Sequence, residues 1–88
     1  MAYNVLVADS VIEFLDTLSK SERDRIMKRL HLLEERPHSA GEPRGKFWIL
    51  KVGRTDYRLA FRIVEEEHAV RVTAIEKRKS HRYKEFYQ

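Results

Sequence analysis

The segment Tyr57–Val64 carries two arginines at even spacing among β-branched and aromatic residues. Side chains alternate between the two faces of a strand, so Arg58 and Arg62 would share one face. The residues on the other face would be apolar: Tyr57, Leu59, Phe61 and Ile63. A guanidinium group can bind two phosphate oxygens at once, which makes this strand a candidate platform for phosphate.

The positive charge of the chain is concentrated in its C-terminal half. The 88 residues have a formal net charge of +4, and the pI is about 9.6. Residues 1–43 have a net charge of −2, and residues 44–88 have a net charge of +6. We therefore expect the C-terminal half to meet an anionic partner, either a polyanion or an acidic protein.

Composition narrows the classes of function. The chain has no cysteine, which excludes disulfides, thiolate metal sites and cysteine nucleophiles. No apolar run is long enough to span a membrane, and the first residues lack the features of a signal peptide. We expect one cytoplasmic domain that covers residues 1–88 and has no membrane partner.

A strand and two helices are predicted in the first half of the chain. Residues 3–7 are apolar and β-branched, which is typical of a short strand. Asp9 or Ser10 would cap the first helix, and the capping-box pattern Ser19–Glu22 would begin the second, which Pro37 would end. The apolar stripe of the first helix would comprise Val11, Ile12, Phe14, Leu15 and Leu18. That of the second helix would comprise Ile26, Met27, Leu30 and Leu33.

The second half of the chain predicts a sheet. Residues 37–45 contain both prolines and two of the three glycines, and predict a loop. Residues 46–64 have the pattern of a β-hairpin, and the acidic residues 65–67 that of a solvated turn. Residues 69–75 would form the third strand of this antiparallel meander. A short helix could follow in residues 76–88.

The predicted fold belongs to the α+β class. Two N-terminal helices would pack on one face of a small, mainly antiparallel four-stranded sheet, in the order β-α-α-β-β-β, with a short C-terminal helix as an option. The opposite face of the sheet would be free. Trp48 shares strand parity with Leu50 and Val52, which favours a place in the core over a base-stacking surface.

The order of these elements and several motifs resemble the RelE/ParE superfamily of toxins from toxin–antitoxin systems, nearer to RelE. The motifs are Trp48–Gly53, the hairpin strand that begins Tyr57-Arg58-Leu59, and the closing run Lys77–Tyr83. The resemblance spans almost the whole chain. The sequence departs from the family pattern at Ile49, where RelE has a second lysine, and at Glu76, which replaces a glycine. The segment between Arg78 and Tyr83 is one residue shorter than in the family.

The resemblance implies a toxin that cuts messenger RNA in the ribosomal decoding site without a metal or other cofactor. Its implied partners are the ribosome, the messenger RNA and a co-expressed antitoxin protein that silences it. The residues that take the family's catalytic positions are Lys51, Arg58, Arg78 and Tyr83. Further cations that could contact RNA phosphates are Lys46, Arg54, Arg62, Lys77, Lys79 and Arg82.

Metal-free cleavage of RNA proceeds by attack of a ribose 2′-OH on the adjacent phosphorus. It needs a base, an acid for the leaving 5′ oxygen, and cations for the developing charge. Arg58 and Arg78 suit charge stabilisation, because arginine remains protonated near neutral pH. Lys51 or Tyr83 would act as the base, and neighbouring cations would favour this role. His81 is a competing acid or base, because an imidazole titrates near neutral pH.

Other functions fit parts of the same pattern. A ParE-like toxin shares this fold but inhibits DNA gyrase and lacks the ribonuclease residues, and a basic nucleic-acid-binding module would need no catalysis. Arg58 and Arg62 would then only solubilise an exposed sheet face, and His81 would be a solvated side chain. No two histidines have the helical spacing of a zinc site with a nearby carboxylate, so we expect no metal site.

Overall fold

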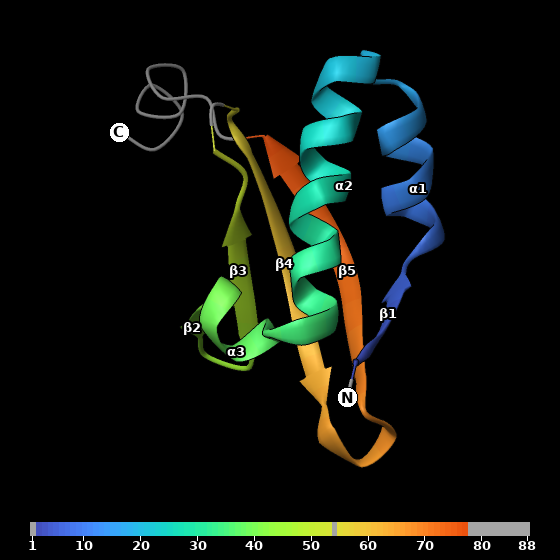
Figure 1. Ribbon diagram of the computed structural model, residues 1–88. Helices are drawn as coiled ribbons and strands as arrows, with labels where there is room; N and C mark the ends of the chain where they lie inside the picture. Colours follow the sequence, from blue (N-terminus) through green and yellow to red (C-terminus); the bar gives the residue numbers. More distant parts are fainter. Residues whose placement is uncertain (1, 54, 78–88) are drawn as a thin grey trace.

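The computed structural model describes residues 2–53 and 55–77 and confirms the α+β class (Figure 1). In chain order the elements are β1 Asn4–Val7, α1 Asp9–Asp16, α2 Lys20–Glu35, α3 Pro37–Ala40, β2 Glu42–Arg44, β3 Phe47–Lys51, β4 Tyr57–Val64, a 3-10 turn Glu65–Glu67, and β5 Ala69–Lys77. None of the helices in these ranges is long and apolar enough to cross a membrane. The helix considered for residues 76–88 falls largely outside the described residues, and Glu76 and Lys77 belong to β5.

The sheet has five strands in the order β1-β5-β4-β3-β2, rather than the four predicted. All neighbouring strands are antiparallel except β1 and β5, which are parallel. The extra strand β2 arises from residues 37–45, which the sequence predicted as a loop. Pro37 begins α3, where its missing N–H costs nothing, and Pro43 lies in the edge strand β2, where proline is tolerated. Gly45, with φ +61°, makes the tight turn from β2 to β3.

Helices α1 and α2 lie against the same face of the sheet (Figure 1). The predicted cap of α2 is confirmed, because Ser19 Oγ accepts a hydrogen bond of 3.2 Å from Glu22 N. The predicted cap of α1 is wrong: Ala8 occupies the N-cap position without a side-chain bond, and Asp9 is already helical. Asp9 still places a negative charge in the first turn, where it complements the helix dipole.

The core lies between these two helices and the sheet. Its fully buried side chains include Ile26, Leu33, Leu50, Leu59 and Phe61. Trp48 packs against this cluster and stacks on Phe61 with ring centroids 6.2 Å apart, which confirms its predicted place in the core. Gly41 comes so close to the core that an added Cβ would lie 2.6 Å from Phe61 Cζ.

The apolar stripes of the helices are narrower in the structure than the sequence predicted. Ile12 is 46% exposed and Met27 is 39% exposed. They line a hollow of about 270 Å³ between the helices, together with Leu15 and Leu30. An apolar surface therefore remains uncovered among the described residues.

A β-bulge shifts the register between β4 and β5. Ala60 pairs with Ala74, but Phe61 pairs with Val72, so Thr73 is an extra residue of β5. Without the bulge, Val72 and Ile75 would lie on opposite faces of the sheet. With it, both pack on the core side.

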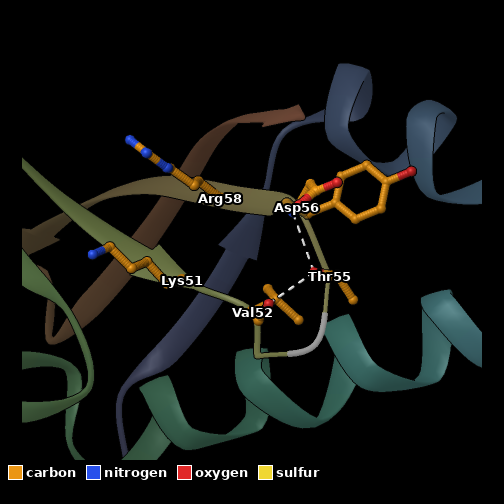
Figure 2. A pocket seen from close by; sticks show the side chains of 6 residues that line it. Lys51, Val52, Thr55, Asp56 and Arg58 are labelled. Carbon is orange, nitrogen blue, oxygen red and sulfur yellow. Dashed lines mark hydrogen bonds between the residues drawn. The ribbon is translucent and has the colours of Figure 1, made fainter. Parts of the chain in front are cut away.

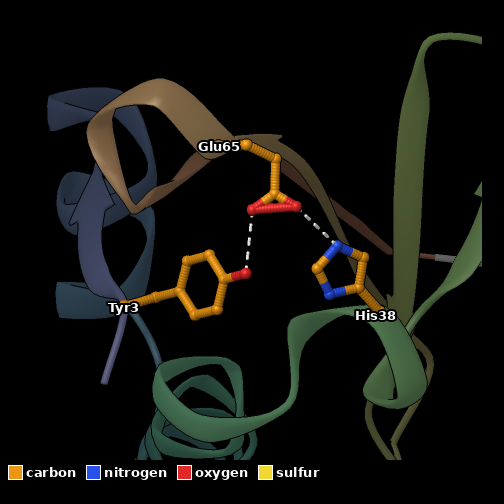
Figure 3. Close-up of polar contacts among 3 residues, drawn as sticks. All are labelled: Tyr3, His38 and Glu65. Atoms are coloured by element: carbon orange, nitrogen blue, oxygen red, sulfur yellow. Dashed lines mark hydrogen bonds and ion pairs between the residues drawn. The ribbon is translucent and has the colours of Figure 1, made fainter. Parts of the chain in front are cut away.

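A cluster of polar and aromatic side chains ties the N-terminus to the turn between β4 and β5 (Figure 3). Tyr3 Oη donates a hydrogen bond of 2.8 Å to Glu65 Oε1, and His38 Nε2 lies 3.0 Å from Glu65 Oε2. The Tyr3 ring stacks on His68 at 4.0 Å between centroids. The hydrogen bond from Tyr3 lowers the pKa of Glu65, and the nearby His38 lowers it further; the same bond raises the pKa of Tyr3.

We expect this cluster to make stability depend on pH in the acid range. The pKa of Glu65 is below its ordinary value of 4.5, so its contribution is present above about pH 4.5 and is lost as the pH falls through the folded-state pKa. Glu65→Gln should lower the melting temperature at pH 7, and the difference from wild type should shrink below pH 4.5. Thermal unfolding at several pH values measures this. Glu66→Gln is the control, and an equal pH-dependent difference in that variant would contradict the prediction.

Candidate functional site

The outer face of the sheet carries the cations that the sequence singled out. The alternation predicted for β4 is confirmed, because Leu59 and Phe61 are buried whereas Arg62 is exposed and Arg58 half-buried. No described helix covers this outer face (Figure 1). Lys51 on β3 lies directly opposite Arg58 on β4. Two cations from neighbouring strands therefore form one row on the uncovered face.

A hollow of about 140 Å³ lies where this row meets the β3–β4 loop (Figure 2). Lys51, Val52, Thr55, Asp56, Tyr57 and Arg58 line it. In Figure 2 the side chains of Lys51 and Arg58 extend to the same side of the hairpin. The hollow is open to solvent and large enough for an anionic group that contacts both cations.

Thr55 holds the loop at the edge of this hollow. Its Oγ1 donates a hydrogen bond of 2.8 Å to the Val52 carbonyl and accepts one of 3.2 Å from Tyr57 N. Both bonds are drawn in Figure 2. The loop begins and ends in the sheet ladder, because Val52 N donates to the Tyr57 carbonyl at 3.1 Å. These bonds join the end of β3 to the start of β4, and so they position Lys51 relative to Arg58.

Carboxylates lie among the cations, and the sequence reasoning missed them. One carboxylate oxygen of Glu42 lies 3.9 Å from Lys51 Nζ, and the other lies 3.9 Å from a guanidinium nitrogen of Arg44. Asp56 lines the hollow, and Glu76 on β5 lies directly opposite Arg58. Asp56 could have been noticed from its place beside Tyr57 in the hairpin. Glu42 carried no such signal, because β2 was not predicted.

The remaining predicted cations are spread over the structure. Arg62 lies on the same face as Arg58 and directly opposite Arg71, whose guanidinium is 3.0 Å from Glu67. Lys46 precedes β3, at the other end of that strand, roughly 16 Å from Lys51 at about 3.3 Å per residue. Lys77 Nζ lies 5.8 Å from the centre of the Tyr57 ring, which is a cation–π distance.

Several predicted site residues lie outside the part of the chain that the structure describes. They are Arg54, Arg78, Lys79, His81, Arg82 and Tyr83. Their roles stay predictions. Within residues 2–53 and 55–77, no group of three or more histidine, aspartate or glutamate side chains could hold a metal ion.

Comparison with known proteins shows which known fold this chain resembles. No protein-family model matches the chain, and no curated protein matches it. Solved structures do match. RelE in the intact E. coli RelBE toxin–antitoxin complex is 23% identical, over 89% of this chain and 99% of that chain, with a TM-score of 0.77.

Two further solved structures agree with this likeness. An arginine double mutant of E. coli toxin RelE in the free state is 26% identical, over 97% of this chain and 94% of that chain, with a TM-score of 0.77. The matching chain of the archaeal RelE–RelB complex from Pyrococcus horikoshii is 20% identical, over 91% of this chain and 99% of that chain, with a TM-score of 0.73. The chain therefore has the RelE-like toxin fold, which confirms the resemblance inferred from its sequence.

Thr55→Val tests whether the loop positions the two cations. The substitution keeps the shape of the side chain but removes both Oγ1 hydrogen bonds, at a cost of about 0.5–1.5 kcal/mol for each. We expect the midpoint of urea unfolding to fall and the affinity for an oligoribonucleotide to fall with it. Thr55→Ser keeps the hydroxyl and should behave like wild type. Unchanged RNA affinity in a destabilised Thr55→Val protein would show that the loop does not position the site.

Proposed function

We propose that this chain is the toxin of a type II toxin–antitoxin system and inhibits translation as a ribosome-dependent, metal-free endonuclease that cuts messenger RNA in the decoding site. One observation carries the proposal. Lys51 and Arg58 lie directly opposite one another on the uncovered sheet face of a RelE-like fold. The site of action would be the cytoplasm, where translating ribosomes are found.

In this mechanism the row of cations binds the scissile phosphate. Arg58 offers a planar fork for two phosphate oxygens and stabilises the negative charge that develops as the 2′-OH attacks. Lys51 approaches the same phosphate from β3. The acceptor of the 2′-OH proton is Lys51, Tyr83 or His81, and Asp56 is a further candidate because its carboxylate lines the same hollow. As the new 2′-O–P bond forms, the P–O5′ bond breaks, and the leaving 5′ oxygen takes a proton from another of these groups in its protonated form. Arg78 completes the charge around the phosphate.

The need for the ribosome follows from the openness of the site. The hollow at Lys51 and Arg58 holds about 140 Å³ and encloses no nucleotide by itself. An RNA bound there by phosphate contacts alone could adopt many orientations. Orientation of reacting groups can supply several kcal/mol of the barrier, which here the ribosome would provide by holding the messenger RNA in place.

The natural partner of the free protein would be an acidic or amphipathic antitoxin segment. The net charge of +4 favours an acidic partner, and the apolar hollow beside Ile12 and Met27 fits the apolar side of a helix. RelE of E. coli and of Pyrococcus horikoshii crystallised with RelB antitoxins. Binding of such a segment would also protect the cell from a cationic protein with affinity for many RNAs.

Arg58→Ala tests the proposed phosphate site. Purified protein is added to programmed ribosomes, and the ends of the messenger RNA are mapped. Wild type should generate new ends in the decoding site, and Arg58→Ala should remove them with little change in thermal stability. Arg36→Ala, which deletes the same charge from the exposed end of α2, is the control. Cleavage by the Arg58→Ala protein would rule out this assignment.

The same assay separates the alternative functions. Inhibition of DNA gyrase without new messenger RNA ends would indicate a ParE-like toxin. Binding of RNA with neither effect would indicate a nucleic-acid-binding module.

Tyr83→Phe and His81→Gln test the proton-transfer step. If Tyr83 supplies the hydroxyl, Tyr83→Phe should slow single-turnover cleavage by on the order of 10² or more, and His81→Gln should do little. The opposite ranking would move the role to His81. Small effects from both would leave Lys51 and Arg78 as the catalytic pair, with Lys51 or Asp56 as the group that accepts the proton.

A further inference from the structure

A second group of cations lies on α2, on the far side of the β3–β4 loop from Lys51 and Arg58. Arg25, Lys28 and Arg29 line a hollow of about 310 Å³ together with Val52 and Gly53. Val52 also lines the hollow at Lys51 and Arg58, so one loop separates the two hollows. In Figure 2 this loop passes close to the helical layer, which lies on the other side of it from Lys51 and Arg58.

The three cations of α2 have no carboxylate partner among the described residues. Lys51, Arg44 and Arg71 each lie within 4.0 Å of a glutamate, but within residues 2–53 and 55–77 no ion pair involves Arg25, Lys28 or Arg29. Arg29 also has a buried Nε without a hydrogen-bond acceptor in this part of the chain.

Arg25 lies on one helical face with Arg29, four residues later, and with Lys28, three residues later. Opposite charges also stand at helical spacing here, because Glu22 is three residues before Arg25 and Asp24 is four residues before Lys28. A bound anion would relieve the repulsion among the three cations.

We infer that the hollow at Arg25, Lys28 and Arg29 binds a backbone phosphate of the same RNA strand that is held at Lys51 and Arg58. The strand passes over the loop at Val52 and Gly53, from the sheet face to α2. Val52 lines both hollows, so the two lie next to each other, and this favours one strand over two separate nucleic acids. This inference rests on the proposed function, because it takes RNA as the ligand of the sheet face.

Gly53 gives the strand room to pass. A Cβ built at Gly53 would have no atom within 4 Å, so the space above the loop is open. The apolar and backbone surface of the loop contributes no negative charge at this point. Phosphate binding on both sides of Val52 and Gly53, whose side chains carry no charge, is the arrangement expected of a track for a single strand.

The test measures binding of oligoribonucleotides that carry 2′-O-methyl groups, which cannot be cleaved by 2′-OH attack. The readout is therefore independent of catalysis. A short RNA of about 4 nucleotides and a long one of about 16 span the range of single-strand site sizes. Affinity is measured over a series of salt concentrations for Arg25→Ala, Lys28→Ala and the control Arg36→Ala. Arg36 follows α2, about 16 Å from Arg25 along the helix axis.

We expect Arg25→Ala and Lys28→Ala to weaken binding of the long RNA. Each should also reduce the slope of log K against log salt by about 0.7 for every phosphate that the variant no longer neutralises. Arg36→Ala should leave the slope unchanged. Binding of the short RNA should be the same in all three variants. Equal effects of Arg25→Ala and Arg36→Ala on the long RNA would overturn the inference, because α2 would then be only a solvated charged face.

Gly53→Asp provides a second test that removes no cation. It places a carboxylate in the proposed path, and Gly53→Asn is the neutral control of the same size. Gly53→Asp should weaken binding of the long RNA by a larger factor than Gly53→Asn, at equal thermal stability. Equal affinities of the two variants would contradict the proposed path.

Two further outcomes would reassign the surface. If Arg25→Ala weakens binding to ribosomes that carry no messenger RNA but not to the long RNA, the occupant is ribosomal RNA and the inference fails. If only binding of an acidic antitoxin peptide is lost, the occupant is the antitoxin and the inference also fails. A wild-type protein that binds the long RNA through α2 but cuts nothing on ribosomes would refute the proposed function and leave the inference standing.

Discussion

The alternation of side chains along β4 is the constraint on which the site depends. β4 pairs with β3 on one side and β5 on the other, and its inner residues Leu59 and Phe61 are fully buried. A slip of one residue would turn Arg58 and Arg62 toward the core, where an unpaired charge is very costly. The burial of two apolar side chains therefore determines where the cations stand. The same burial keeps the strand of the candidate site in register, and no further interaction is needed for this.

The bulge at Thr73 extends this constraint to the neighbouring strand. It allows Val72 and Ile75, which are three residues apart, to pack on the same side of the sheet. As a consequence Glu76, and not Ile75, shares the outer face with Arg58. A packing requirement in the core thus places a carboxylate beside the candidate catalytic arginine.

The ion pairs that Glu42 makes on the outer face are long and exposed to solvent. Glu42 lies 3.9 Å from both Lys51 and Arg44, and all three side chains are more than half exposed. Exposed pairs of this kind contribute about 0–1 kcal/mol. In the proposed mechanism a phosphate would therefore replace Glu42 at small cost, and until then Glu42 would reduce the attraction of the free protein for other anions. The cations of α2 form no ion pair among the described residues, which is why we propose them as a second contact for RNA.

Much of the fold could be predicted because its signals are local. The capping box at Ser19–Glu22 and the hairpin of β3 and β4 depend on neighbours a few residues apart. The resemblance to RelE singled out Lys51 as a partner of Arg58, and the hairpin made their proximity expected, because such strands pair along their length. The strand β2, by contrast, is a short polar segment that exists only because it pairs with β3.

What the sequence by itself determined is the alternation that separates the arginines of β4 from its apolar residues, since covalent geometry sets the period of a strand. The tertiary structure alone decided that β1 pairs in parallel with β5, that Glu42 and Glu76 lie near Lys51 and Arg58, and that Ile12 and Met27 are left uncovered. These features depend on which distant surfaces are buried against each other. That choice is made by the packing of the whole core, and no short stretch of sequence contains it.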